Sequence, residues 1–203
     1  MRSQRVLTLV EISLTVALSA VLSLLAVRLP INVAGGTISF AMLPILVLGL
    51  RRGVVPAVLA GVAFGAIDYL IEPFFVAPAQ VALDYGVAFA AVGLAGLGAP
   101  LYRKALASSP MRAFAISLPW ILLGGLGRFV AAWTSGVIFF ASNTPAGQTV
   151  WYYSAVYNLG YIVPSIALCA AAASIVLPAL ERAVPMSAPY PVSDDAEQLK
   201  AAV

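Results

Sequence analysis

Long runs of apolar residues, separated by short polar segments, make up most of this chain. A helix needs about 20 mainly apolar residues to cross the hydrocarbon core of a bilayer, and most of the runs reach that length. The pattern therefore predicts an all-α integral membrane protein, folded as a bundle of six transmembrane helices. The predicted spans cover residues 6–27, 38–50, 54–71, 78–101, 113–140 and 150–180.

The second predicted span is short. Its 13 residues make a helix of about 20 Å, whereas the hydrocarbon core is about 30 Å thick. We expect this span to stop short of the outer surface or to begin inside the protein. The Gly35-Gly36 segment before it and the uncharged loop 142–149 are then candidate lids over an outward-facing pocket.

The basic residues predict the orientation of the bundle. With the N-terminus in the cytoplasm, nine of the 11 lie inside, while Arg28 lies outside and Arg128 lies within the fifth span. This N-in, C-in arrangement obeys the positive-inside rule, whereas five spans with a re-entrant second one would split the basic loops. Residues 1–184 are predicted to form one transmembrane domain. Residues 185–203 are rich in Pro, Ser and Asp and predict a disordered cytoplasmic tail.

The composition agrees with a membrane protein and excludes several function classes. The 203 residues are 62% hydrophobic and 9% charged, against about 25% charged in soluble domains, and the mean hydropathy is +1.01. The chain leaves no room for a nucleotide-binding domain and has no Gly-rich phosphate loop with its Lys, so any ATP hydrolysis belongs to another subunit. One Cys and no His argue against a transition-metal site. Its short basic loops do not predict a nucleic-acid surface.

Four charged residues lie in the predicted spans or at their edge: Asp68, Glu72, Asp84 and Arg128. A charge at the bilayer centre costs roughly 2.5 kcal/mol or more, so such residues are candidates for a functional site. Three acids and one base favour a cationic ligand. Asp84 is either a ligand-binding acid tuned by Arg128 or a purely structural partner of that Arg, and Asp68 is a second potential charge partner.

Aromatic side chains and amides complete a candidate pocket for a flat organic cation. Tyr153, Tyr157 and Tyr161 recur every four residues, on one helix face. Aromatic faces attract positive charge, and Asn158 offers both a donor and an acceptor at a depth where an amide needs a partner. The candidate binding residues are Gln80, Asp84, Tyr85, Trp133, Phe140, Tyr153, Tyr157 and Asn158.

Catalysis fits these residues poorly. An intramembrane serine protease needs a His or Lys base, and the predicted spans contain neither. Asp68 and Asp84 lack the Gly-x-Gly-Asp context of the paired-aspartate proteases. We therefore expect no enzymatic activity from this chain and no cofactor.

The first span carries small residues at Ser13, Ala17 and Ala20. A small-x-x-x-small pattern lets another helix approach closely, either within the bundle or from a partner protein.

Several short motifs are distributed over the six spans. They are Glu11-Ile12, Leu43-Pro44, Leu50-Arg51-Arg52-Gly53, Leu83-Asp84-Tyr85, Ala88-Phe89, Gly93-Leu94-Ala95-Gly96, and Tyr153-Ser154 with Asn158. Together they resemble the substrate-binding S components of energy-coupling factor (ECF) vitamin transporters, and most closely the thiamine-specific S components. The resemblance implies a six-helix bundle that binds thiamine near its outer face.

The resemblance also implies roles for individual residues. The acid of the family's pocket matches Asp84, one methylene shorter than the family's Glu, and its Tyr and Asn match Tyr153 and Asn158. The family's Trp matches Phe140, which can still stack on a ligand. The family's His matches Ala132, so that hydrogen bond is lost, although the neighbouring Trp133 can compensate in part. The aromatic residue of the family's first loop is missing around Gly35. These departures leave a thiamine precursor or a related pyrimidine open as the substrate.

The resemblance implies a location in the plasma membrane. The implied partners are a transmembrane coupling protein and two cytoplasmic ATPases. The coupling protein would dock on the first span, where the family's Ala-x-x-x-Ala corresponds to Ser13 and Ala17. Three alternatives to thiamine capture remain open: an S component for another small vitamin, a stand-alone proton-coupled or facilitative carrier, and a scaffolding protein. In the carrier, Asp68, Asp84 and Arg128 would form the relay.

Overall fold

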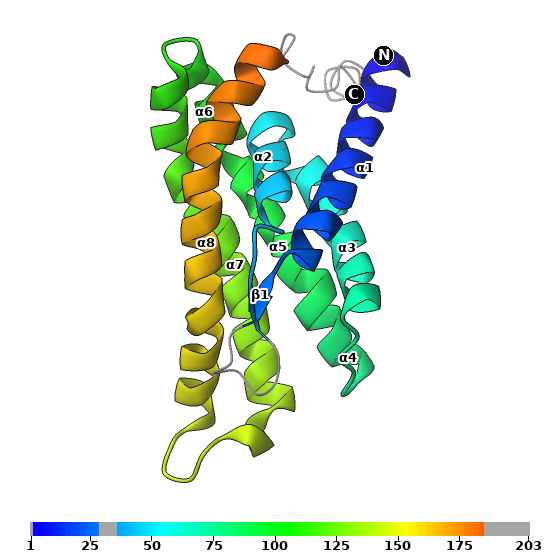
Figure 1. Cartoon of the computed structure of the whole chain (residues 1–203), viewed down its shortest axis with the longest axis vertical. Helices are drawn as coiled ribbons and strands as arrows, with labels where there is room; N and C mark the ends of the chain where they lie inside the picture. Colours follow the sequence, from blue (N-terminus) through cyan, green and yellow to red (C-terminus); the bar gives the residue numbers. More distant parts are fainter. Residues whose placement is uncertain (1, 29–35, 185–203) are drawn as a thin grey trace, which may run out of the picture.

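The computed structural model describes residues 2–28 and 36–184, and these are almost entirely helical (Figure 1). The predicted all-α membrane class is confirmed by five described helices that are long and apolar enough to cross a bilayer. The count of six spans, the N-in, C-in orientation and the domain boundary stay predictions, and the predicted tail 185–203 lies outside the described residues. The long helices are α1 (Arg2–Leu24), α3 (Val54–Ile71), α7 (Pro110–Phe139) and α8 (Val150–Ala183), with a composite helix between α3 and α7.

The composite helix, from Pro78 to Leu106, is irregular along its length. A π-helix and a 3₁₀-helix interrupt its α-helical segments, and single turns of π-helix occur frequently at functional sites. Its segments are α4 (Pro78–Val81), the π-helix η1 (Ala82–Val87), α5 (Ala88–Val92), the 3₁₀-helix η2 (Gly93–Gly98) and α6 (Ala99–Leu106). A short 3₁₀-helix, η3 (Ala141–Asn143), follows α7.

The short second helix, α2 (Leu43–Arg52), begins five residues after the predicted start of the span. Before it, the two-residue strands β1 (Val27–Arg28) and β2 (Thr37–Ile38) pair in an antiparallel ladder, which takes Ile38 out of the helix. Pro44 lies in the first turn of α2, where a missing backbone N–H costs nothing. Ala41 and Met42, just before α2, are buried, which agrees with the expectation that this segment begins inside the protein.

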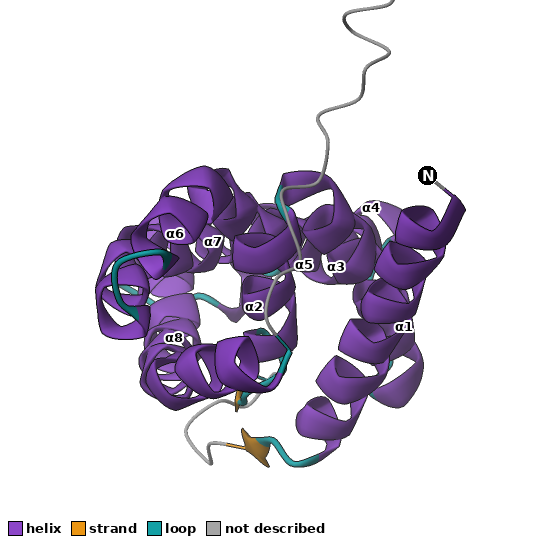
Figure 2. Ribbon diagram, turned by 90° about the horizontal axis from the view of Figure 1, so that it is seen from above, coloured by secondary structure: helices purple, strands orange, loops and turns teal. Residues whose placement is uncertain are grey.

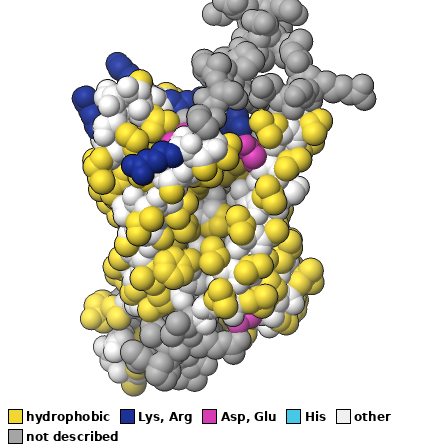
Figure 3. Space-filling model, turned by 45° about the horizontal axis from the view of Figure 1, so that its top comes forward, with side chains coloured by type: hydrophobic (Ala, Val, Ile, Leu, Met, Phe, Trp, Pro, Cys, Tyr) yellow, Lys and Arg dark blue, Asp and Glu magenta, His cyan; other side chains and the backbone are white. Residues whose placement is uncertain are grey.

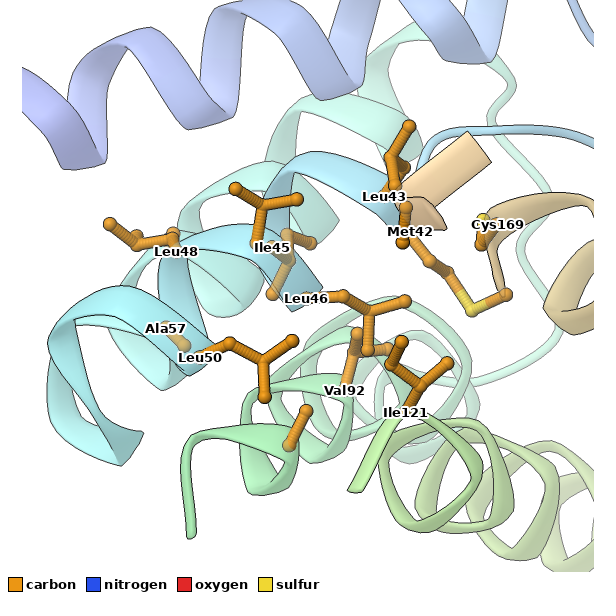
Figure 4. Close-up of a cluster of buried hydrophobic side chains, with 14 of the residues drawn as sticks. Met42, Leu43, Ile45, Leu46, Leu48, Leu50, Ala57, Val92, Ile121 and Cys169 are labelled. Atoms are coloured by element: carbon orange, nitrogen blue, oxygen red, sulfur yellow. The ribbon is translucent and has the colours of Figure 1, made fainter. Parts of the chain in front are cut away.

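The core of the bundle is built around α2. Viewed from above, the other helices surround it (Figure 2), and eight of its ten residues are buried. Leu46 and Leu50 pack with Val92 and Ile121 from the composite helix and α7 (Figure 4). Because protein rather than lipid covers α2, its length need not match the bilayer.

Apolar side chains cover the outside of the longer helices (Figure 3). On α1, for example, Leu9, Leu14 and Leu18 are each more than half exposed. A soluble monomer rarely exposes apolar surface of this extent, so lipid is the natural surrounding of these faces.

Charged residues gather at the end of the bundle where α1 begins and α8 ends (Figures 1 and 3). Arg51 forms a buried ion pair with Glu181, with 2.8 Å between Nη1 and Oε1, and Arg103 donates to the Arg51 carbonyl oxygen at 2.8 Å. Arg52 pairs with Glu11 of α1. These contacts tie α2 to α1, α6 and α8 at this end.

Candidate ligand-binding cavity

A cavity of about 700 Å³ lies among the ends of α3 and α7, the beginnings of α4 and α8, and η1. These segments are at the opposite end of the bundle from the charged cluster (Figure 1). The volume falls within the range of about 300–1,000 Å³ that is usual for small-molecule sites. Its wall contains both acidic and aromatic side chains.

The π-helix η1 carries Asp84 into the cavity wall. The Asp84 Oδ2 atom accepts a hydrogen bond from Gln80 Nε2 at 2.7 Å. The two residues are four apart in the sequence and thus lie on one face of the helix. The other carboxylate oxygen, Oδ1, accepts no further hydrogen bond of good geometry from the described residues, although the buried Ser135 hydroxyl of α7 lies close to the carboxylate, so Oδ1 is available to a ligand.

Glycines of α3 hold the composite helix close. A Cβ atom built on Gly65 would lie 2.1 Å from the Tyr85 carbonyl oxygen, and one on Gly61 would lie 2.2 Å from that of Phe89. The backbones of α3 and η1 thus pack directly on each other. This contact fixes the part of the cavity wall that holds Asp84.

Asp68 and Arg128 also line the cavity, on α3 and α7. Asp68 Oδ1 accepts a hydrogen bond from Ser23 of α1 at 2.6 Å. The Arg128 guanidinium lies 4.4 Å from the centre of the Phe89 ring, a cation–π contact. Among residues 2–28 and 36–184, Arg128 forms no ion pair within 4.0 Å with either Asp, so the geometry does not favour the purely structural pairing with Asp84.

Three Tyr rings of α8 form a row along the cavity. The ring centres of Tyr153 and Tyr157 are 6.3 Å apart, and those of Tyr157 and Tyr161 are 6.0 Å apart. All three line the cavity, which confirms their predicted common face. The row offers aromatic surface to a flat ligand.

Asn158 is buried in the cavity wall with both ends of its amide engaged. Its Nδ2 donates to the Ser154 carbonyl oxygen at 2.8 Å, and its Oδ1 accepts from the Tyr161 hydroxyl at 2.7 Å. The partner that we expected for an amide at this depth is therefore Tyr161. These bonds fix the side-chain orientation before a ligand arrives.

The rim of the cavity comes from three connecting segments. Phe74, in the loop after α3, packs against Phe140 with ring centres 5.7 Å apart, and both line the cavity. Gly36 and Thr37, before α2, and Asn143, after α7, complete the rim. Both segments predicted as lids therefore contribute to it, although Gly35 lies outside the described residues.

Trp133 is the one predicted binding residue outside the cavity lining. Its indole N–H donates to the Trp151 carbonyl oxygen at 3.0 Å, and its ring packs against Trp151 and Phe129. The adjacent Ala132 lines the cavity instead, because neighbouring residues on a helix point about 100° apart. Trp133 thus does not replace the missing His at position 132.

Seven of the eight predicted binding residues line the cavity, together with the predicted charge partners Asp68 and Arg128. Sequence reasoning missed Phe74 as a lining residue and did not assign Phe89 to the pocket. A Phe in an apolar run gives no signal that distinguishes a cavity wall from a lipid-facing surface. The seven are Gln80, Asp84, Tyr85, Phe140, Tyr153, Tyr157 and Asn158.

The predicted docking residues lie on α1, away from the cavity lining. Ser13 and Ala17 are exposed, and Ser13 Oγ donates within its own helix to Leu9. Ala20 is half-buried and packs against the core. The exposed part of the small-residue pattern is thus accessible to another helix.

A family model described as "Thiamine transporter protein" matches residues 9–185, which is most of the chain. The chain belongs to the thiamine transporter protein family. The resemblance to thiamine-specific S components is therefore confirmed at the level of the family. A member of the thiamine transporter protein family is a multi-pass plasma membrane protein with a transport role and not an enzyme.

Two relatives in the thiamine transporter protein family are similar over most of their length. "Thiamine transporter ThiT" of Bacillus subtilis (strain 168) is 35% identical over 171 residues, which cover 83% of this chain and 89% of that protein. "Thiamine transporter ThiT" of Lacticaseibacillus paracasei is 31% identical over 145 residues, which cover 69% of this chain and 72% of that protein. A solved structure of ThiT from Listeria monocytogenes has a TM-score of 0.79 at 23% identity, covering 88% of this chain and 97% of that one. This last match shows that the fold is shared.

Proposed function

We propose that this protein captures thiamine at the outer face of the plasma membrane, as the S component of an ECF importer. The observation that carries the proposal is the carboxylate of Asp84, which has a free oxygen in a cavity walled by aromatic rings. Thiamine joins a cationic thiazolium ring to an aminopyrimidine. A carboxylate can accept from the amino group or balance the positive charge.

The remaining lining residues fit the same ligand. The row of Tyr153, Tyr157 and Tyr161 gives aromatic surface for both heterocycles, and Phe140, directly after α7, also lines the cavity. Asn158 is fixed in orientation beside them. Desolvated cation–π contacts contribute about 2 kcal/mol, so Asp84 and the rings together favour a cation over a neutral compound of the same shape.

The distribution of charge supports an N-in, C-in orientation of six helical segments. The beginning of α1 and the end of α8 lie at the same end of the bundle, and the visible Lys and Arg side chains gather there (Figures 1 and 3). By the positive-inside rule that end is cytoplasmic. The cavity then opens on the outer side, where an importer would capture its substrate.

The coupling protein and two ATPases are proposed partners, and α1 is the proposed docking helix. Its exposed face carries Ser13 and Ala17 among larger apolar residues. Small residues at this spacing allow close contact between transmembrane helices. This proposal is separate from ligand capture, since binding requires only the cavity.

A thiamine precursor or related aminopyrimidine, whose amino group can donate to Asp84, is the second candidate ligand. Ala132 puts no hydrogen-bonding side chain at the position of the family's His, and Trp133 faces away from the cavity. A smaller ligand that lacks the thiazolium ring would lose less from this difference than thiamine does. The second candidate keeps the same site and the same acid.

Calorimetric titration of the purified protein with thiamine, its aminopyrimidine precursor and a neutral vitamin tests the proposal. Thiamine binding that is tighter than either of the others supports it. Tighter binding of the precursor would identify the pyrimidine as the substrate. No binding of thiamine or of the aminopyrimidine by folded protein would reject the capture function. Calorimetry is preferable to fluorescence because none of the three Trp residues lines the cavity.

A further inference from the structure

Gln80 lines the cavity but is only 1% exposed. It lies on α4, between the loop that follows α3 and the π-helix that carries Asp84. Because protein covers Gln80 almost completely, the contacts of its amide decide its role.

Both ends of the Gln80 amide are engaged within the protein. Its Nε2 donates to Asp84 Oδ2 at 2.7 Å, and its Oε1 accepts from the Val76 backbone N–H at 3.1 Å. A neutral amide can donate to a carboxylate and accept from a backbone N–H at the same time, whereas an ionised acid can only accept and a hydrocarbon can do neither. An amide therefore suits both partners without a change of protonation.

The loop that Gln80 holds is part of the cavity wall. Phe74 of this loop packs on Phe140, and the Tyr85 hydroxyl donates to the Glu72 carbonyl oxygen at 2.8 Å. Glu72 and Phe74 both line the cavity. Through its two hydrogen bonds, Gln80 joins this loop to the carboxylate of Asp84.

We infer that Gln80 is a positioning residue for Asp84 and not a ligand contact. By occupying Oδ2, it orients the carboxylate so that Oδ1 is directed to the ligand, and it ties that orientation to the loop at the rim. This inference rests on the proposed function, because it assigns the ligand to Asp84. It reassigns Gln80 from the predicted set of binding residues.

A double-mutant cycle tests the inference, with Gln80→Met, Asp84→Ala and the double variant. Met has nearly the same size as Gln but makes neither hydrogen bond. We expect Gln80→Met to weaken thiamine binding roughly tenfold, the size expected for a hydrogen bond to a charged group. In the Asp84→Ala background, the same change should have almost no further effect on binding. Wild-type affinity in Gln80→Met, or losses that multiply in the double variant, would overturn the inference.

Melting temperatures without ligand complete the test. Because Gln80 and Asp84 share one hydrogen bond, the decreases in melting temperature caused by Gln80→Met and Asp84→Ala should be less than additive in the double variant. Additive decreases would overturn the inference, even if thiamine does not bind. Tyr102→Phe is the matched control, since it loses a 3.5 Å contact to Glu181 near the charged cluster. It should lower stability and leave the affinity unchanged. If the wild-type protein does not bind thiamine but the decreases in melting temperature are less than additive, the proposed function is rejected and the link between Gln80 and Asp84 stands.

Discussion

Tyr161 has a specific task in the cavity, because its hydroxyl holds the amide of Asn158. The Tyr161 hydroxyl oxygen lies 2.7 Å from Asn158 Oδ1. Because Asn158 is buried, this hydrogen bond is away from bulk water. Asn158 then presents a fixed side chain to the cavity. A change at Tyr161 should therefore act through Asn158.

The variant Tyr161→Phe removes only this hydroxyl. Loss of a buried hydrogen bond costs about 1 kcal/mol, which corresponds to roughly fivefold in affinity. We expect thiamine binding to weaken by that factor in a calorimetric titration. Tyr152→Phe is the matched control on the same helix, since Tyr152 is 61% exposed and outside the cavity lining. Equal losses in both variants would contradict the role of Tyr161.

At the residue scale, the sequence allowed prediction of most polar members of the site but not of their exact surroundings. Charged and amide groups inside apolar runs are conspicuous, which is why Asp84 and Asn158 were found. The direction of Trp133 was not predictable, since a rotation of about 100° separates it from Ala132. Phe74 lies in a loop whose path depends on Gln80, a tertiary contact.

At the scale of elements, the π-helix η1 and the glycines of α3 determine where Asp84 lies. The close approach at Gly65 leaves no room for a side chain between α3 and η1. The positions of the long helices were predictable from hydropathy. The π-helix, the 3₁₀-helix and the late start of α2 were not, because they depend on packing and strand pairing rather than on periodicity.

Gly65→Ala tests this contact. The added methyl group would lie 2.1 Å from the Tyr85 carbonyl oxygen, so the two helices must move apart. We expect a loss of about 1–3 kcal/mol in stability, as for other overpacked cores, and weaker thiamine binding, since η1 carries Asp84.

The control is Gly160→Ala, in the interior of α8, where the added methyl group meets no atom of another element within 4 Å. Ala favours helix by about 1 kcal/mol over Gly, so this variant should melt at the same or a higher temperature. Thermal unfolding in detergent gives the melting temperatures of Gly65→Ala and Gly160→Ala. Similar melting temperatures for the two variants would contradict the packing argument.

The charged groups at the two ends of the molecule have different surroundings. Three acids and Arg128 line the cavity, whereas the opposite end holds the buried Arg51–Glu181 pair that joins α2 to α8. Removing one member of a buried pair leaves the other uncompensated. This end therefore contributes to the stability of the bundle rather than to ligand capture.

Glu181→Ala should destabilise the protein by about 3–5 kcal/mol, the usual cost of breaking a buried ion pair. Its neighbour Arg182 is exposed, so Arg182→Ala should change stability by less than about 0.5 kcal/mol. Thermal unfolding of both variants gives the comparison. Thiamine affinity of the folded Glu181→Ala protein should remain that of wild type, and a large loss of affinity would contradict the separation of the two ends.

The most direct test of the account compares Asp84→Asn with Asp68→Asn in thiamine titrations by calorimetry. The two changes are chemically identical, and both residues line the cavity. We expect Asp84→Asn to weaken binding by at least roughly tenfold, as for lost contacts to a charged group. Asp68→Asn should stay within about fivefold of wild type, because the proposed ligand contact is Asp84 and a charge without direct contact contributes up to about 1 kcal/mol. Unchanged binding in Asp84→Asn, or a larger loss in Asp68→Asn, would contradict the account.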